Sequence, residues 1–344
     1  MEKNFLFFVL LIVVGESCFM MLPNTKKHAC QSAGPISKFI LSLILEDFPE
    51  IDRLIYFLSK KDVQHLDLRL LVSNNQYNLP SSIFTCLQLR YLSLHGCSIQ
   101  LAPPTFKGFD MLNSLELHSV TISSEILESL ISSCPLLEQL LLRDIIYSGV
   151  IEINAPKLRS FDFVENIGSV CLKSVPRLAK FSLWHTKYHV GIGNCFKSFS
   201  SLEYLELNAC CLKFVAAVTG EVPTRLPFDL NSVKHLCLKE INLEELDEDA
   251  DYNGDSQALE CLEVEAFSDV TFNHLRKVHL FRTVGSNPEM QLIKLLLAKP
   301  PMLKEMLIFP LNVDDDFNRI EFPIMINSFR RASPEVEVIY ANYG

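Results

Sequence analysis

The chain has 344 residues, of which 49% are hydrophobic and only 12 are glycine and 17 proline, so it can bury a large core and is neither fibrous nor of low complexity. Its formal net charge of -10 argues against nucleic-acid binding, because binding to phosphates depends on clustered lysine and arginine. Its 11 cysteines include no C-x-x-C pair, a spacing typical of zinc sites, so we interpret them as reduced thiols packed in the core.

The first 22 residues differ in composition from the rest of the chain. Lys3 is followed by the apolar run FLFFVLLIVV, and Gly15 and Ser17 then provide small residues at the spacing of a signal-cleavage site. We expect residues 1–22 to be a signal-like segment, or an anchor-like segment if residues 18–22 extend the run. A membrane would be a partner only if this segment is retained. Against secretion, the chain contains no N-x-S/T glycosylation acceptor.

The pattern apolar-x-x-apolar-x-apolar recurs along the remainder of the chain. In LEYLEL, for example, Leu202, Leu205 and Leu207 occupy the apolar positions. Successive copies mostly begin 20 to 28 residues apart, which is the period of leucine-rich repeats. The copies begin at Val63, Leu89, Leu112, Leu137, Leu158, Leu178, Leu202, Val233, Leu259, Leu275 and Leu303.

The last three positions of each copy predict a short strand, whose two apolar residues share one face while the middle residue lies on the other. One repeat cannot bury its leucines alone, so consecutive repeats are expected to stack their strands into a parallel sheet with a continuous core. The predicted fold class is an α/β leucine-rich-repeat solenoid, a curved parallel β-sheet with irregular and helical return segments.

The segments between the strands also carry structural signals. Cys97, Cys210 and Asn166 occur where such repeats turn the chain after the strand. A helix is predicted over residues 123–135, with serine at its start, and another over 287–299, with Asn287 as its cap. The residue three positions before a copy is often apolar and is expected in the core: Cys86, Phe109, Cys134, Val175, Phe199, Leu230 and Phe272.

Three stretches resemble the plant F-box, leucine-rich-repeat and FBD proteins. Residues 34–43 (GPISKFILSL) and 50–68 (EIDRLIYFLSKKDVQHLDL) are similar to the bridge before the family's repeats. Residues 79–99 (LPSSIFTCLQLRYLSLHGCSI) resemble its first full repeat, and residues 272–308 (FNHLRKVHLFRTVGSNPEMQLIKLLLAKPPMLKEMLI) resemble its FBD unit. The resemblance implies the target-recognition subunit of a Skp/cullin/F-box ubiquitin ligase.

These features together predict the domain organisation. After residues 1–22 we expect a bridge at 23–62, leucine-rich repeats at 63–270, an FBD-like unit at 271–310 and a C-terminal tail at 311–344. An F-box needs roughly 45 residues ahead of the bridge, so we expect it to be missing from this chain. Docking to a Skp/cullin adaptor is therefore expected only if an F-box is restored.

Few residues suggest a metal site or a catalytic activity. The segment DADYNGDSQALE fits the EF-hand spacing, with Asp249, Asp251, Asn253 and Glu260 as calcium ligands, but no helix pair frames it, so an acidic surface insertion is the preferred reading. His185 and His189 lie four residues apart, yet follow a predicted strand, so they are not expected to bind zinc. No nucleotide-binding or hydrolase motif occurs. We expect no enzyme activity, no cofactor and no metal.

The functional surface is expected on the concave face of the sheet, opposite the core leucines. Aromatic residues and arginine supply much of the binding energy at protein interfaces, and Trp184, the only tryptophan, lies mid-array near Tyr204. The candidate partner-binding residues are Tyr91, His95, Arg143, Trp184, Tyr204, Glu206 and Lys239; the same face is expected to carry Glu116, His118, Lys180, His235 and Phe281.

Two functions remain open at this point. The first is a cytoplasmic or nuclear scaffold that binds a target protein, as the family resemblance implies. The second is a secreted or membrane-anchored recognition protein of the secretory pathway, which the N-terminal apolar segment favours.

Overall fold

A computed structural model describes residues 10–12, 37–45, 51–72, 76–100, 103–147, 149–165, 169–185, 201–208, 232–240, 272–311 and 320–341. The chain forms two compact units, Met1–Arg177 and Leu178–Gly344, which we describe separately. Of the N-terminal apolar segment only residues 10–12 are described, as a short strand. Within the described ranges no helix combines the length and the apolar character needed to cross a membrane.

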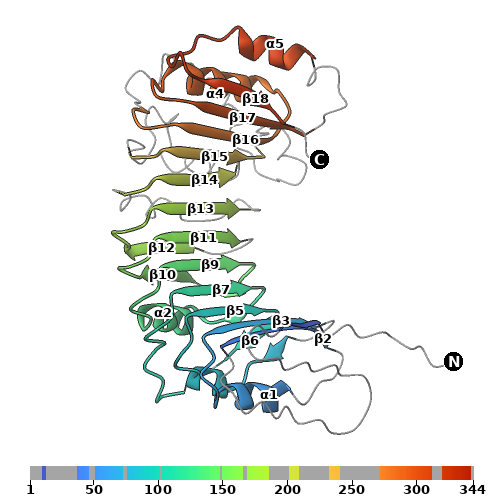
Figure 1. Cartoon of the computed structure of the whole chain (residues 1–344), viewed down its shortest axis with the longest axis vertical. Coiled ribbons are helices and arrows are strands. Elements are labelled where there is room, and N and C mark those ends of the chain that lie inside the picture. The colour runs from blue at the N-terminus through green and yellow to red at the C-terminus, as the bar shows by residue number, and fades with distance from the viewer. Residues whose placement is uncertain are drawn as a thin grey trace, which may run out of the picture. The chain divides into compact units, whose positions relative to one another are not determined.

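The first unit is built on a sheet whose strands follow one another in chain order (Figure 1). Neighbouring strands are parallel, except that β1 pairs with β2 in the antiparallel sense. The strands are β1 (Leu10–Ile12), β2 (Lys38–Leu45), β3 (His65–Val72), β5 (Tyr91–His95), β7 (Ser114–His118), β9 (Gln139–Arg143) and β11 (Ser160–Glu165).

The register of this sheet places each repeat's leucines directly beside those of the next. Leu92 of β5 pairs with Leu115 of β7, and Leu115 pairs with Leu140 of β9. These side chains are at most 2% exposed. The predicted inward positions therefore form a continuous core, which confirms the repeat pattern as the basis of the fold.

The return segments of the first unit close the other side of the core. They include α1 (Ile51–Leu58), the 3-10 helix η1 (Ser81–Thr85) and α2 (Ser124–Ser132). Two small parallel sheets join consecutive turns: β4 (Tyr77–Asn78), β6 (Cys97–Ile99) and β8 (Thr121–Ile122) form one, and β10 (Val150–Asn154) and β12 (Ser169–Ser174) form the other. Ser123 caps α2 by accepting a hydrogen bond from the backbone N–H of Ile126, as predicted.

The second unit continues the same design. Its parallel strands, again in chain order, are β13 (Lys180–His185), β14 (Tyr204–Asn208), β15 (His235–Lys239), β16 (Lys277–Thr283), β17 (Glu305–Pro310) and β18 (Glu337–Tyr340). Two described helices belong to it, α4 (Asn287–Ala298) and α5 (Phe322–Asn327). The lead-in residue Phe272 is buried, like Cys86, Phe109, Cys134 and Val175 in the first unit.

Strands and helices also lie in the two segments expected to flank the repeats. β2 and α1 lie in the segment expected as a bridge, yet β2 pairs in register with β3. The expected C-terminal tail contains α5 and β18, and β18 pairs in parallel with β17. β18 lacks the full template, since Glu335 occupies its first position, whereas Ile36, Phe39 and Leu41 do fit the template and indicate one further copy before Val63.

One helix cap was also predicted wrongly. Asn287 is the first residue of α4, and Ser286 is the cap residue that precedes it. The carboxylate of Glu289 accepts hydrogen bonds from the backbone N–H groups of Val284, Gly285 and Ser286, at 3.0, 2.6 and 2.9 Å. Glu289 is fully buried, so this carboxylate holds the whole connection between β16 and α4 in place.

Candidate functional site

The candidate site is the face of each sheet that lies opposite the leucines. In a strand, alternate residues point to opposite faces. The residue between the two strand leucines of each repeat therefore lies on this open face, as do the residue before the first leucine and the residue after the second. In β14 these outward residues are Tyr204, Glu206 and Asn208, whereas Leu205 and Leu207 are 1% exposed in the core.

A buried carboxylate organises the open face of the second unit. Glu206 accepts hydrogen bonds from Trp184 Nε1 at 2.8 Å on one oxygen and from the Tyr204 hydroxyl at 2.5 Å on the other. The Lys239 ammonium lies 2.7 Å from the first oxygen, and the Ser182 hydroxyl lies 3.4 Å from the second. Both oxygens of Glu206 thus have two donors, and the four partners come from three adjacent strands.

Lys239 also contacts the aromatic rings around it. Its Nζ lies 3.8 Å from the centroid of the Trp184 ring and 5.4 Å from that of Phe281, both within the range of cation–π attraction. Glu206 and Lys239 therefore hold the indole ring from two sides, through its N–H and through its face. We refer to Trp184, Tyr204, Glu206 and Lys239 as the Trp184 cluster.

The ionisation of the cluster follows from these contacts. Burial disfavours the charged form of Glu206, but Lys239, Tyr204 and Trp184 outweigh it and lower the pKa of this carboxyl. Burial and the hydrogen bond to Glu206 raise the pKa of Tyr204. At neutral pH Glu206 is therefore a carboxylate and Tyr204 a neutral phenol.

The polar contacts continue across the next strands of the second unit. Tyr204 packs edge-on against His235, with ring centroids 4.7 Å apart, and His235 packs in the same way against His279 at 4.3 Å. His279 Nε2 lies 2.9 Å from Glu305, whose carboxylate also meets Lys277 at 3.1 Å. His279 is therefore paired with Glu305, whereas the buried Nε2 of His235 has no hydrogen-bond partner among the described residues.

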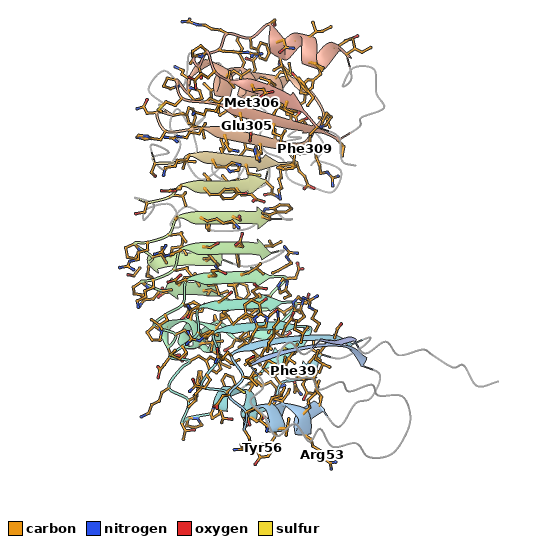
Figure 2. The ribbon with its side chains drawn as sticks, viewed as in Figure 1. Phe39, Arg53, Tyr56, Glu305, Met306 and Phe309 are labelled. Atoms are coloured by element: carbon orange, nitrogen blue, oxygen red, sulfur yellow. The ribbon has the colours of Figure 1, made fainter. Side chains whose placement is uncertain are left out.

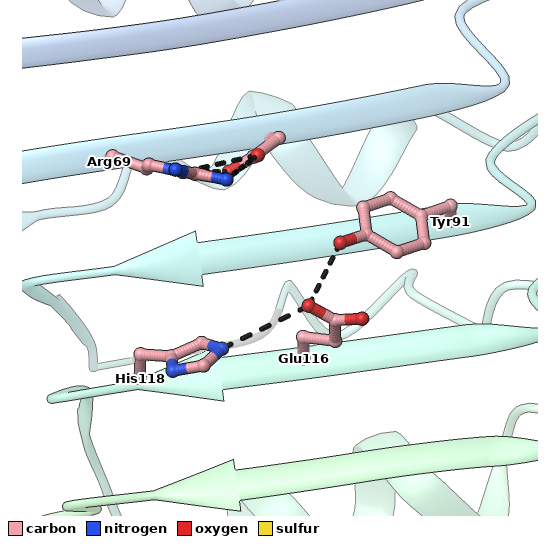
Figure 3. Close-up of polar contacts among 5 residues, drawn as sticks. Arg69, Tyr91, Glu116 and His118 are labelled. Atoms are coloured by element: carbon pink, nitrogen blue, oxygen red, sulfur yellow. Dashed lines mark hydrogen bonds and ion pairs between the residues drawn. The ribbon is translucent and has the colours of Figure 1, made fainter. Parts of the chain in front are cut away.

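A second polar cluster lies on the open face of the first unit (Figure 3). The Tyr91 hydroxyl donates a 2.8 Å hydrogen bond to Glu116, and His118 Nε2 lies 3.9 Å from the same carboxylate oxygen. Arg69 binds the buried carboxylate of Asp67 through Nε and a terminal nitrogen, the shortest contact being 2.8 Å. The contact with His118 lowers the pKa of Glu116, burial raises it, and the hydrogen bond from Tyr91 lowers it, so that the net pKa is lowered.

Two ring stacks cover part of this cluster. His65 stacks on Tyr91 with centroids 4.0 Å apart, and His95 stacks on His118 at 3.9 Å, each pair within 6° of parallel. Burial, and then the neighbouring His118, lower the pKa of His95 to about 4. His95 is therefore neutral in the folded protein at the pH of the cell.

We predict that acid destabilises the first unit partly through His95. Because its folded pKa lies below the unfolded value of about 6.5, the unfolded chain takes up the proton first as the pH falls. The stability that the neutral ring contributes is complete above about pH 6.5 and is lost between about pH 6.5 and pH 4. In His95→Phe, which retains a ring to stack on His118, urea midpoints at about pH 7 and pH 5 should differ less than in the parent. An equal or larger difference would contradict this assignment.

The structure brings together four of the seven predicted partner-binding residues, namely those of the Trp184 cluster. Tyr91 and His95 belong instead to the cluster around Glu116 and His118 in the first unit. Arg143 ends β9, is exposed, and lies beside His118 in register. His185 ends strand β13 and His189 lies outside the described residues.

The weak calcium hypothesis cannot be placed on the structure, since Asp249, Asp251, Asn253 and Glu260 all fall outside the described ranges. Within those ranges, no three histidine, cysteine, aspartate or glutamate side chains are arranged to hold a metal ion.

Several outward residues were missed by the sequence reasoning. The rule that identified Tyr91 and His95 also places His65, Asp67 and Arg69 on the face when it is applied to the copy at Val63. Applied to the copies at Leu275 and Leu303, it gives His279, Glu305 and Phe309. The alternation within these three copies therefore indicates all six residues, including Arg69 and Phe309.

Comparison with known proteins agrees with this architecture. Residues 31–250 match the sequence model described as "FBD-associated F-box protein At5g56370, LRR repeats". The chain is 28% identical over 339 residues to F-box/FBD/LRR-repeat protein At1g13570 of Arabidopsis thaliana, which covers 89% of this chain and 80% of that protein. It is 41% identical over 68 residues to F-box/FBD/LRR-repeat protein At1g78750 of the same plant, covering 20% of this chain and 14% of that protein. The chain therefore belongs to the plant F-box/FBD/leucine-rich-repeat family.

Proposed function

We propose that the chain is a non-enzymatic scaffold that binds a target protein through the open face of its sheet, around the Trp184 cluster. The observation that carries the proposal is the pre-ordering of Trp184 and Tyr204 by a single buried carboxylate. Large aromatic side chains that are already held in place lose little conformational entropy on binding, and such residues are frequent among the strongest contacts at interfaces. The relatives' names describe repeat proteins of the same kind, which supports this reading.

The proposal includes a role in protein degradation. The relatives are named F-box proteins. In the role that the sequence resemblance implies, the repeats would hold the target, and an F-box, if restored to this chain, would dock to a Skp/cullin adaptor. In that arrangement the repeats would select the protein to be ubiquitinated. The four donors on Glu206 leave this carboxylate engaged in positioning side chains, so we assign it no catalytic step.

Replacing Trp184 and Tyr204 separately with alanine should weaken target capture about tenfold or more, because each change removes a large ring from the proposed contact. The measurement is affinity purification of the tagged chain from plant cells, followed by quantitative mass spectrometry. Circular dichroism should be unchanged, since both side chains are only partly buried on the open face.

Tyr56→Ala is the matched control. Tyr56 is 58% exposed on α1, which belongs to a return segment, and Figure 2 shows it pointing away from the sheet. Proteins retained by the parent and by Tyr56→Ala, but lost from both other variants, would be the targets. Equal capture by all four proteins would remove the Trp184 cluster as the binding site.

We also propose a cytoplasmic or nuclear location. The structure describes five cysteines as free thiols, and burial raises the pKa of Cys97 and of Cys237 to about 12, so neither is readily oxidised. A fluorescent protein fused to the C-terminus should appear in the cytosol or nucleus. Fluorescence in the secretory pathway would favour the secreted or anchored alternative.

A further inference from the structure

The open face changes character towards the end of the second unit. Each strand of the first unit from β3 to β11 has two outward positions that can be compared: the residue between the two buried ones, and the residue after the second. Of these ten residues on β3, β5, β7, β9 and β11, only Leu141 and Val164 are apolar. On β16 and β17 the same positions hold His279, Phe281, Leu307 and Phe309, and Ile339 is the middle outward residue of β18.

Four of these side chains form a continuous patch, which we call the Phe309 patch. It consists of Phe281, Leu307, Phe309 and Ile339. Phe281 lies beside Phe309 in register, with their rings stacked at a centroid distance of 4.5 Å and an angle of 6°. Leu307 pairs with Ile339 on the next strand. Figure 2 shows Phe309 near the carboxyl end of β17.

The core does not require apolar residues at these positions. The inward side chains of the same strands, Val278, Leu280, Met306 and Ile308, are fully buried and complete the interior without them. The four patch residues are only partly buried. An apolar side chain that stays partly exposed to water is less stable there than when it is buried, and a bound partner would bury it. Contiguous exposed apolar side chains are therefore typical of binding surfaces.

Three basic side chains around the patch are paired within the protein. Lys239 is bound to Glu206 at 2.7 Å, Lys277 to Glu305 at 3.1 Å, and Arg282 to Glu240 at 3.3 Å. A partner that brought a carboxylate or phosphate here would have to break one of these pairs or remain unpaired. The electrostatics therefore disfavour a partner segment that is acidic or phosphorylated where it meets the patch.

We infer that the Phe309 patch binds an apolar side chain, aliphatic or aromatic, on the target protein, and that the target segment is neither acidic nor phosphorylated. This inference rests on the proposed function and adds to it the chemistry of the partner. The Trp184 cluster lies on β13 to β15, and the patch lies on β16 to β18 of the same unit. Lys239 contacts both Trp184 and Phe281 and therefore connects the cluster with the patch.

The test uses a phage-displayed library of random linear peptides, panned against the full chain. We expect the retained peptides to be enriched in leucine, isoleucine, phenylalanine or tryptophan without enrichment in acidic residues. Phe309→Ser, and separately Leu307→Thr in case the first variant folds poorly, should bind these peptides at least about tenfold more weakly. Raising sodium chloride from about 0.1 M to about 0.5 M should change the affinity less than about twofold.

Ile324→Ser is the matched control, because Ile324 is an apolar residue of the same unit, 65% exposed on α5 and away from the sheet face. Retention of acidic peptides, recovery of no peptide, or full binding by both patch variants would overturn the inference. If binding is lost in Trp184→Ala but kept in both patch variants, the inference fails while the proposed function stands. If Trp184→Ala, Phe309→Ser and Leu307→Thr all bind as the parent does while Ile324→Ser loses binding, the inference and the proposed function both fail.

Discussion

Glu206→Ala is expected to disrupt the Trp184 cluster and to destabilise the second unit by about 3 kcal/mol or more. The substitution leaves the Lys239 ammonium without its carboxylate, and it removes the acceptor for Trp184 Nε1 and for the Tyr204 hydroxyl. Removing one member of a buried ion pair commonly costs about 3–5 kcal/mol, because the remaining charge stays desolvated. Urea unfolding should therefore shift to lower concentration.

The cluster contains its own reporter, because Trp184 is the only tryptophan in the chain. Its fluorescence should change in Glu206→Ala before any unfolding, since the indole loses both its hydrogen bond and the cation held over its face. Glu206→Gln, which retains an acceptor but removes the charge, should give an intermediate stability. Unaltered fluorescence and an unaltered urea midpoint in the alanine variant would show that Glu206 does not organise this surface.

Glu289→Ala is expected to have an effect of similar size for a different reason. Its carboxylate is fully buried and satisfies three consecutive backbone N–H groups between β16 and α4. Each buried donor left without a partner costs about 1–3 kcal/mol, so the total loss should be about 3 kcal/mol or more. Burial raises the pKa of Glu289 even though these donors favour its charged form, which shows how far it is removed from water.

Urea unfolding followed by circular dichroism measures this effect, and Glu335→Ala is the control, since Glu335 is an exposed glutamate later in the same unit. The control should unfold at the parent's midpoint. If Glu289→Ala does so too, the three backbone contacts are not important to stability. Because this loop and helix belong to the FBD-like segment, the result also tests whether that segment folds together with the strands beside it.

The fold was predictable because one physical requirement repeats along the chain. Every copy of the template must bury its two strand leucines, so the spacing of Leu92, Leu115 and Leu140 gave the sheet and its register directly. β18 was harder to predict, since Glu335 occupies the first template position ahead of EVIY, whereas β2 could have been predicted, because Ile36, Phe39 and Leu41 fit the template. β18 belongs to the sheet because it extends the hydrogen bonding of β17, and a linear pattern does not record that pairing.

The candidate site was predictable in its position but not in its organisation. Alternation along the strands placed Trp184, Tyr204, Glu206 and Lys239 on one face. The convergence of Trp184, Tyr204 and Lys239 on the carboxylate of Glu206 depends on rotamers and on the lateral register of three strands, which the sequence does not show. Of the Phe309 patch, Phe281 was predicted on the open face, and the same rule applied to the copy at Leu303 indicates Leu307 and Phe309. Ile339 lies on β18, which the template does not identify.

Site-specific photo-crosslinking tests the central claim most directly, because it records which surface touches a partner in the living cell. A photoreactive phenylalanine analogue replaces Tyr204 in one protein and Tyr56 in a second, so that the probe lies on the open face in one case and on α1 in the other. If the open face binds the target, a discrete crosslinked product should form from position 204 and not from position 56. Crosslinking from position 56 alone would place the partner on the return side and contradict the account.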